Sequence, residues 1–175
     1  FINLHDEILI KKNKNNNHKI KFIGKFSSNI KSNNTVSKLF NIIDKKKILK
    51  DKYQIIIKKN IPSESGLGGG SMNAATILNY LIKKKLIRVS NKEIINIANL
   101  IGSDVILGIY SKNLILRSNN LIKTFSIKKK IFILIVKPNF GCSTKKIYSK
   151  VKEYTKERFY HSSKKKEGQI GNFNI

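Results

Sequence analysis

Cysteine, proline and tryptophan are scarce in this sequence, which has one Cys, two Pro and no Trp among 175 residues. The single cysteine, Cys142, excludes an internal disulfide and has no partner for a cysteine metal site. The low proline content and the 40% hydrophobic residues favour a folded chain over a disordered one. No apolar run approaches the ~18 residues that span a bilayer, and the polar segment 11–21 follows the opening residues too closely for a signal peptide. We therefore expect a protein of a reducing, cytoplasm-like compartment with no membrane partner.

Acidic residues and arginines are also few. Asp and Glu total 10 against 36 Lys and Arg, which gives a net charge of +26. Strong positive charge attracts polyanions and keeps a basic nucleic-acid-binding module open as an alternative. Arginine, which reads phosphates and bases bidentately, occurs only as Arg88, Arg117 and Arg158. The abundant Lys, Asn and Ile all have A/T-rich codons, so a compositional bias explains the charge, and no specific nucleic acid is expected.

Short apolar runs and amphipathic segments follow one another along the chain, a pattern typical of mixed α and β proteins. The length allows one hydrophobic core, or one domain and part of another, and the start at Phe1 rather than Met indicates a fragment or a gene model without its start. Alternating or β-branched patterns predict strands at residues 1–10, 20–23, 53–57, 105–110, 114–117, 121–127 and 131–136. Helical periodicity and cap residues predict helices at 35–48 behind Asn34, at 71–86, at 91–100 behind a Ser90-x-x-Glu93 capping box, and around Ile147, Tyr148 and Val151 behind Ser143 or Thr144.

A glycine-rich segment joins the strand predicted at 53–57 to the helix predicted at 71–86. Residues 62–71 read Pro-Ser-Glu-Ser-Gly-Leu-Gly-Gly-Gly-Ser. Glycines accept positive φ angles and let backbone N–H groups approach an anion, and the N-terminus of the following helix favours negative charge. The segment has neither the Gly-Lys-Ser/Thr of a Walker A loop nor the Gly-x-Gly-x-x-Gly of a dinucleotide turn. It predicts a phosphate cradle, with an ordinary glycine-rich connection as the alternative.

Three motifs, in the same order along the chain, resemble those of the GHMP kinases. Residues 62–75 are similar to the signature Pro-x-x-x-Gly-Leu-Gly-Gly-Gly-Ser-Ser-(Asn/Asp)-Ala-Ala, with Met72 in place of the second serine, which removes one hydroxyl. Residues 101–105 resemble Gly-Ala-Asp-Val, and residues 138–148 resemble Pro-x-x-x-x-Ser-Thr-x-x-x-Tyr/Phe. The resemblance implies the α+β GHMP kinase fold, with an ATP-binding domain of mixed sheet and helices at residues 1–128 and an incomplete ferredoxin-like domain at 129–175. The family's opening Lys-x-Asn-Leu strand and most of its C-terminal domain have no counterpart in the sequence.

The resemblance is strongest to the kinases of non-mevalonate isoprenoid biosynthesis. It implies ATP-dependent phosphorylation of a hydroxyl of 4-diphosphocytidyl-2-C-methyl-D-erythritol, with ATP and Mg²⁺, in a bacterial cytoplasm or a plastid-like organelle. It also allows a homodimer. GHMP kinases that act on homoserine or mevalonate stay open as alternatives, as does a degenerate remnant that binds nucleotide without turnover.

The same resemblance implies roles for individual residues. Asp104 matches the catalytic aspartate that accepts the proton of the attacking hydroxyl, although alone it would be read as a helix-end aspartate. Tyr148 matches an aromatic residue that stacks on the cytosine ring, with a core tyrosine as the alternative, and Thr144 bounds the substrate pocket. Ser71, at the start of the helix predicted at 71–86, is a candidate contact for phosphate or Mg²⁺. The implied ATP-binding residues are Asn34, Lys59, Pro62, Gly66, Leu67, Gly68, Gly69, Gly70 and Ser71.

Overall fold

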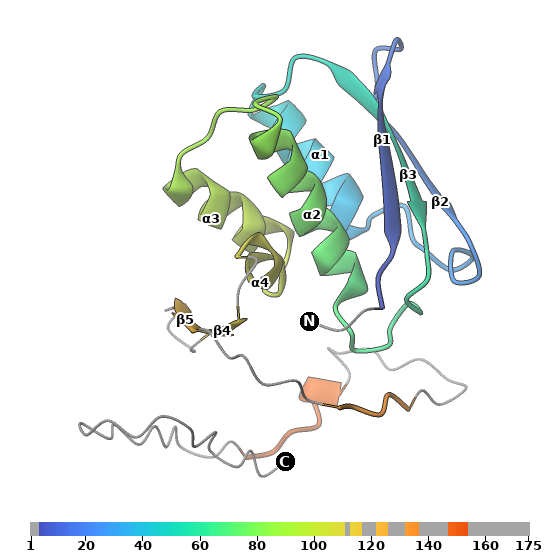
Figure 1. The fold of residues 1–175 in the computed structure, drawn as a ribbon, viewed down its shortest axis with the longest axis vertical. Coiled ribbons are helices and arrows are strands. Elements are labelled where there is room, and N and C mark those ends of the chain that lie inside the picture. The colour runs from blue at the N-terminus through green and yellow to red at the C-terminus, as the bar shows by residue number, and fades with distance from the viewer. Residues whose placement is uncertain (1–3, 111–112, 117–121, 126–131, 137–146, 154–175) are drawn as a thin grey trace.

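A three-stranded mixed sheet and the helices packed on one of its faces form the body of the protein (Figure 1). The computed structural model describes residues 4–110, 113–116, 122–125, 132–136 and 147–153. The strands are β1 (Glu7–Asn13), β2 (Lys19–Ile23), β3 (Lys52–Lys58), β4 (Asn113–Leu116) and β5 (Ile122–Phe125). The helices are α1 (Thr35–Lys45), α2 (Gly69–Lys83), α3 (Asn91–Ile101) and α4 (Val105–Ile109). None of these helices has the length and apolarity needed to cross a bilayer.

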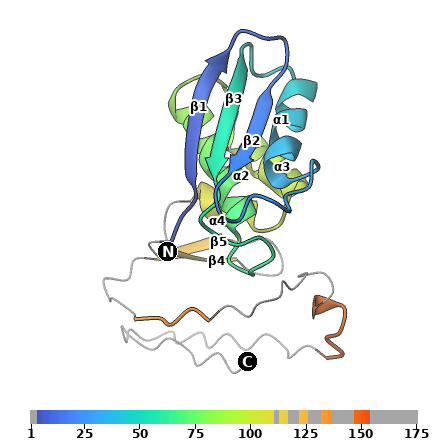
Figure 2. The same cartoon turned by 90° about the vertical axis from the view of Figure 1, so that its right-hand side faces the viewer.

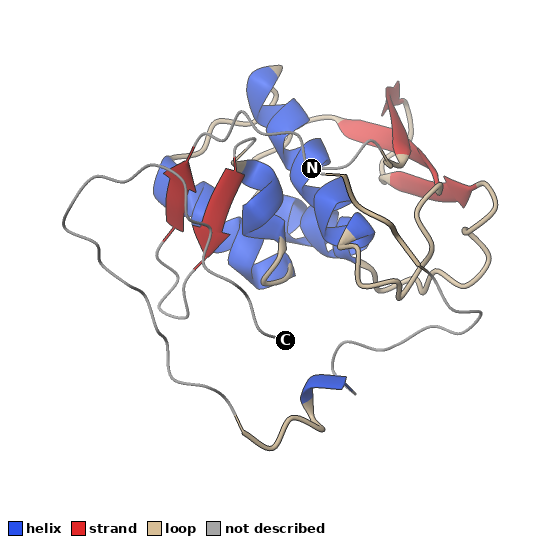
Figure 3. Cartoon of the chain, turned by 60° about the horizontal axis from the view of Figure 1, so that its bottom comes forward, coloured by secondary structure: helices blue, strands red, loops and turns tan. Residues whose placement is uncertain are grey.

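The sheet has the order β1-β3-β2, with β1 antiparallel and β2 parallel to the central strand. Alternate residues of β3, namely Tyr53, Ile55 and Ile57, are buried beneath the helices because successive side chains of a strand point to opposite faces. The register places Ile8 of β1 and Phe22 of β2 on either side of Ile57. The predicted mixed sheet with helices is thus confirmed, and β4 and β5 form a separate antiparallel pair (Figures 2 and 3).

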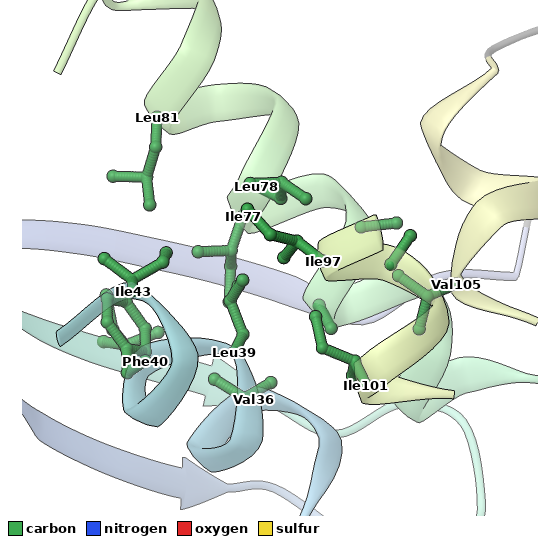
Figure 4. Close-up of a cluster of buried hydrophobic side chains, with 14 of the residues drawn as sticks. Val36, Leu39, Phe40, Ile43, Ile77, Leu78, Leu81, Ile97, Ile101 and Val105 are labelled. Atoms are coloured by element: carbon green, nitrogen blue, oxygen red, sulfur yellow. The ribbon is translucent and has the colours of Figure 1, made fainter. Parts of the chain in front are cut away.

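The core lies between the sheet and the helices, and helical spacing of apolar residues builds it. Leu39 and Ile43 of α1 and Leu78 of α2 are fully buried, one helical turn or so from other buried residues of the same helix. Ile97 and Ile101 bring α3 onto this cluster. Figure 4 shows side chains of all four helices meeting in this cluster: Val36, Leu39, Phe40, Ile43, Ile77, Leu78, Leu81, Ile97, Ile101 and Val105.

The N-caps predicted at Asn34 and Ser90 are present. The Asn34 side chain accepts hydrogen bonds from the backbone N–H groups of Val36 and Ser37 at 3.0 and 3.1 Å. Ser90 and Glu93 form the predicted capping box, in which the Glu93 N–H donates to Ser90 Oγ at 3.3 Å and the Ser90 N–H donates to Glu93 Oε2 at 3.1 Å.

Two helices end earlier than the apolar pattern predicts. We expected helices through residues 48 and 86, but α1 ends at Lys45 and α2 at Lys83. Lys47 and Lys85, each two residues beyond these ends, have φ angles of 53° and 56°. A left-handed residue closes a helix, and glycine is its usual sequence signal. Lysine at these positions hid both ends from sequence analysis.

The strand predicted at residues 105–110 is wrong, because this segment forms the short helix α4. Its β-branched composition favours a strand, but tertiary packing decides otherwise. Val105 and Ile106 are buried in the core, and α4 lies against both α2 and α3. Gly108 permits the close approach: a Cβ atom there would lie 2.6 Å from the Cβ of Ala75.

The buried strand predicted at residues 131–136 is also wrong over its described part, 132–136. These residues have no strand conformation, and Phe132 and Leu134 are 98% and 89% exposed. A strand needs a neighbour to satisfy its backbone groups, and neither described sheet includes this segment. The strands predicted at 114–117 and 121–127 are confirmed as β4 and β5.

The helix predicted around Ile147, Tyr148 and Val151 is shorter than expected within the described residues, since Val151 is not helical. Residues 147 and 148 are helical and followed by a turn, whereas Ser143 and Thr144 lie outside the described residues. The Tyr148 side chain is 62% exposed, which excludes the core alternative for this tyrosine.

Candidate functional site

The glycine loop connects β3 to α2 and ends directly in the first turn of the helix (Figure 1). Gly66 and Gly68 have φ angles of 73° and 66°, in the region that favours glycine. Gly69 and Gly70 are closely packed instead, since a Cβ atom would lie 3.1 Å from Ile61 Cγ2 and 3.2 Å from Thr35 Oγ1, respectively. The loop is therefore shaped both by backbone conformation and by close packing.

The first turn of α2 is suited to receive an anion. Its N-cap residue is Gly68, and no side chain caps the helix. The first N–H groups of a helix have no partner within it and carry the positive end of the helix dipole. An oxyanion placed there can accept hydrogen bonds that a capping side chain would otherwise accept.

The N-terminus of α1 lies beside that of α2. The Thr35 hydroxyl donates a 2.6 Å hydrogen bond to the carbonyl of Gly70, which joins the two helix starts. Both polar atoms of the Asn34 side-chain amide already have hydrogen-bond partners within the protein. Its Oδ1 caps α1, and its Nδ2 donates to the carbonyls of Lys31 and Ser32 at 2.9 and 3.3 Å.

A cavity of about 1050 Å³ opens over the loop and brings distant parts of the chain together. Its apolar and aromatic walls include Phe22, Phe26 and Ile30, and residues 135–136 and 147–148 also border it. The predicted site residues that line it are Asn34, Lys59, Pro62, Gly66, Leu67, Gly68, Gly69, Gly70, Ser71, Asp104 and Tyr148. Thr144 lies outside the described residues.

Asp104 stands immediately before α4 but does not act as its cap. No side-chain cap hydrogen bond is present at α4, and Oδ1 of Asp104 accepts only a 3.2 Å hydrogen bond from the neighbouring Ser103 hydroxyl among the described residues. The carboxylate is exposed and borders the same cavity as the glycine loop. The packing of α4 against α2 fixes the position of Asp104, which therefore depends on a segment whose composition predicts a strand.

Lys59 is buried, with 4% of its surface exposed, and its ammonium group is paired with Asp6. An ammonium held by a carboxylate is not a free phosphate ligand, so the part Lys59 plays toward a nucleotide stays a prediction. The pairing stabilises the charge of an otherwise buried lysine.

Asp6 is bonded to residues on both sides of the glycine loop, and no sequence pattern singles it out. Its side chain is 0% exposed and accepts hydrogen bonds from Lys59, Asn60, Ile61 and Asn73. Burial raises the pKa of the Asp6 carboxyl, but the donors from Lys59, Ile61, Asn73 and Asn60 outweigh it and hold the pKa below its ordinary value of 3.8. The donors are 53 to 67 residues away along the chain, so no local pattern signalled them.

Oxygen ligands for a metal are sparse in the site. Within the described ranges, no three His, Cys, Asp or Glu side chains gather as a metal-binding cluster. The Ser71 hydroxyl and the Asp104 carboxylate do line one cavity, and both are oxygen ligands of the kind that Mg²⁺ takes. A magnesium ion that enters with a polyphosphate needs only one or two protein ligands.

This chain is similar to known proteins in sequence and in fold. The model of the GHMP kinases N terminal domain matches residues 34–112. The chain is 54% identical over 160 residues to 4-diphosphocytidyl-2-C-methyl-D-erythritol kinase of Pelagibacter ubique (strain HTCC1062), which covers 91% of this chain and 57% of the relative. It is 37% identical over 121 residues to the protein of the same name from Sulfurihydrogenibium sp. (strain YO3AOP1), covering 67% of this chain and 43% of the relative.

The structural match concerns the fold. A crystal structure of 4-(cytidine 5'-diphospho)-2C-methyl-D-erythritol kinase superposes with a TM-score of 0.53 at 20% identity, over 71% of this chain and 43% of that one. The chain spans about half the length of the curated relatives it matches. Since one family accounts for the sequence matches, the fold and the glycine loop alike, the chain belongs to the GHMP kinases.

Proposed function

We propose that the chain is the ATP-binding part of a kinase that phosphorylates 4-diphosphocytidyl-2-C-methyl-D-erythritol. The observation that carries this proposal is the position of Asp104, a carboxylate without a capping role, on the same cavity as the uncapped, glycine-rich start of α2. Phosphoryl transfer needs an anion site and a proton acceptor on one cavity. The names of the relatives from Pelagibacter ubique and Sulfurihydrogenibium sp. support the choice of acceptor.

The phosphates of ATP would lie against residues 66–71, where backbone N–H groups and the α2 dipole favour negative charge. The aromatic and apolar wall of Phe22, Phe26 and Ile30 suits the nucleobase, with Asn34 beside it. Bound Mg²⁺ would neutralise phosphate charge, and the Ser71 hydroxyl is the ligand that the chain offers at the helix start. Lys59 and Pro62 border the entry to the loop.

Asp104 would act as the proton acceptor. The oxygen of the substrate hydroxyl forms the new bond to the γ-phosphorus, the bond to the β,γ-bridging oxygen breaks, and the hydroxyl proton passes to the Asp104 carboxylate. The leaving group is ADP. The hydrogen bond from Ser103 fixes the carboxylate without taking both of its oxygens, since it reaches only Oδ1.

Tyr148 would stack on the cytosine ring of the substrate. Its exposed ring borders the cavity, as a stacking residue requires. Thr144 as a boundary of the pocket, the domain division at residue 128, the homodimer and the bacterial or plastid-like compartment all stay predictions.

The other functional alternatives have less support. The relatives carry the name of one enzyme, so a homoserine or mevalonate kinase is not favoured, nor is a basic nucleic-acid-binding module. A remnant that binds nucleotide without turnover would differ from an active kinase only in lacking phosphoryl transfer. The test below distinguishes the two.

The test measures binding and transfer separately. Titration with fluorescent mant-ATP gives the Kd of the chain, and incubation with γ-labelled ATP and each acceptor in turn measures transfer. We expect saturable mant-ATP binding that ATP displaces, and label on 4-diphosphocytidyl-2-C-methyl-D-erythritol but not on homoserine or mevalonate. Binding without transfer would support the remnant, and transfer to another acceptor would overturn the substrate.

A further inference from the structure

One buried carboxylate connects both ends of the glycine loop. Asp6 directly precedes β1, and the pairing of Glu7 with Lys58 in the antiparallel register brings Asp6 beside Lys59, where β3 ends and the loop begins. The start of β1 is therefore in contact with the start of the loop, although 53 residues separate Asp6 from Lys59.

The two carboxylate oxygens have different partners. Oδ1 accepts the backbone N–H groups of Asn60 at 2.8 Å and Ile61 at 2.9 Å, on the β3 side of the loop. Oδ2 accepts Nδ2 of Asn73 at 2.8 Å, on the α2 side, and is also paired with the Lys59 ammonium. The loop residues between Ile61 and Asn73 are thus held at both ends by a single side chain.

This arrangement is rigid for physical reasons. Hydrogen bonds to an ionised acceptor are shorter and stronger than neutral ones, and those of Asp6 are shielded from water because its side chain is 0% exposed. Asn73 is also buried, with 5% of its surface exposed. A loop that is already ordered loses less conformational entropy when its backbone N–H groups bind an anion.

We infer that Asp6 is a positioning residue for the phosphate loop, acting through Asn73 and the backbone of Asn60 and Ile61, and that Lys59 serves as its counter-charge. The inference rests on the proposed function only in taking nucleotide phosphate as the anion that the loop binds. Asp6 itself touches no reacting group, because its oxygens are occupied by these donors.

The alternative is that Asp6 stabilises the whole fold and has no specific effect on the glycine loop. The two roles differ in where the protein opens when the contact is lost. Loss of general stability raises amide hydrogen exchange in every helix, whereas loss of positioning raises it at the loop alone.

The test uses a pair of matched asparagine variants on α2. Asn73→Ala removes the contact between Asp6 and the helix, and alanine is a good helix former. Asn79→Ala is the control, since Nδ2 of Asn79 donates to the carbonyls of Gly108 and Ile109 at 3.2 and 3.3 Å and not to Asp6. Asp6→Asn is a third variant. It is more disruptive, because it leaves the buried Lys59 ammonium without its negatively charged partner.

We expect Asn73→Ala to raise amide exchange at residues 60–71 by about tenfold, with α1 and α3 unchanged, and to raise the Kd for mant-ATP by a similar factor. Asn79→Ala should leave both quantities at the loop as in the wild type. Unchanged exchange at the loop, an equal rise in all helices, or an unchanged Kd beside faster loop exchange would each overturn the inference. If Asp6→Asn does not fold, Asn73→Ala decides alone.

The exchange experiment needs no nucleotide, so it separates the two proposals. If the wild type does not bind mant-ATP but Asn73→Ala still opens the loop selectively, the proposed function fails and the positioning of the loop by Asp6 stands. If the wild type binds mant-ATP and Asn73→Ala behaves like it in both measurements, the positioning role fails and the proposed function stands.

Discussion

The hydroxyl of Thr35, the first residue of α1, donates a 2.6 Å hydrogen bond to the carbonyl of Gly70 in the first turn of α2. The two helices belong to separate segments of the sequence, yet this bond makes their N-termini neighbours on one cavity. The wall of the cavity near Asn34 is therefore hydrogen-bonded to the glycine loop rather than merely adjacent to it.

We expect Thr35→Val to loosen this attachment. Valine keeps the shape of the side chain but cannot donate, so the Gly70 carbonyl loses the hydroxyl as a hydrogen-bond partner, at a cost of about 1 kcal/mol in the free energy of unfolding. The Kd for mant-ATP should rise several-fold, measured by fluorescence titration. Thr76→Val, at an exposed position of α2, is the control and should change neither quantity. A Thr35→Val protein with the wild-type Kd would show that the bond does not shape the nucleotide site.

Gly108→Ala should destabilise the protein at the crossing of α4 and α2. The new Cβ would lie 2.6 Å from Ala75 Cβ and 3.0 Å from Met72 Sδ, so the helices must separate. Overpacking of this kind costs about 1 to 3 kcal/mol, which urea unfolding followed by circular dichroism can measure. Gly102→Ala is a suitable control, because its φ of 169° is extended backbone and the nearest atom to a Cβ there is 4.0 Å away. Equal stability of the two variants would contradict the tight crossing.

The same contact explains Met72, which stands where the family signature has a serine. Its sulfur lies toward Gly108, on the face of α2 that packs against α4. Met72 is therefore a packing residue of the crossing that places Asp104.

Asp104→Asn should abolish phosphoryl transfer while leaving nucleotide binding nearly unchanged. Asparagine has a similar shape but cannot accept the hydroxyl proton, and loss of a general base typically lowers kcat by about 10²- to 10⁴-fold. Transfer of labelled phosphate and mant-ATP titration measure the two properties separately. Asp51→Asn, which removes only the surface pair with Lys12, is the matched control. An undiminished kcat in Asp104→Asn would remove Asp104 from the mechanism.

Stability should fall as the pH drops below about 6.5 because of His18. Its side chain is 5% exposed, and its Nδ1 accepts the backbone N–H of Tyr53 at 3.0 Å, which requires an unprotonated nitrogen. Burial lowers the pKa of His18 below its ordinary value of 6.5, despite the attraction of Asp44. The unfolded chain therefore binds a proton at a higher pH than the folded one, and protonation favours unfolding.

The measurement is the Tm as a function of pH between about 5 and 8, with His18→Gln as the comparison. Glutamine can still accept the Tyr53 N–H, but it does not titrate. We expect the Tm of the wild type to decrease as the pH is lowered from about 8 to 5, and the Tm of His18→Gln to change less over the same range. Parallel curves for the two proteins would assign the pH dependence to other groups.

Local sequence patterns were sufficient wherever the interactions that form an element are close together in the chain. The caps of α1 and α3, the amphipathic spacing of α2 and the β-branched run of β3 depend on residues a few positions apart, so each can be recognised in a short window. The glycine loop also belongs to this group, because positive φ angles and close backbone approach require glycine directly.

Tertiary structure decided the features that depend on distant partners. Residues 105–109 are helical because Gly108 lets them pack closely on Ala75, although their composition favours a strand. Residues 132–136 have the composition of a buried strand, but no strand of the described sheets lies beside them to pair with. Lys59 looks like a solvated lysine until the fold brings Asp6 beside it. The sequence by itself therefore determined the glycine loop and its resemblance to a family. Only the fold determined how both ends of that loop are held, because the side-chain partners of the Asp6 carboxylate lie 53 to 67 residues away along the chain.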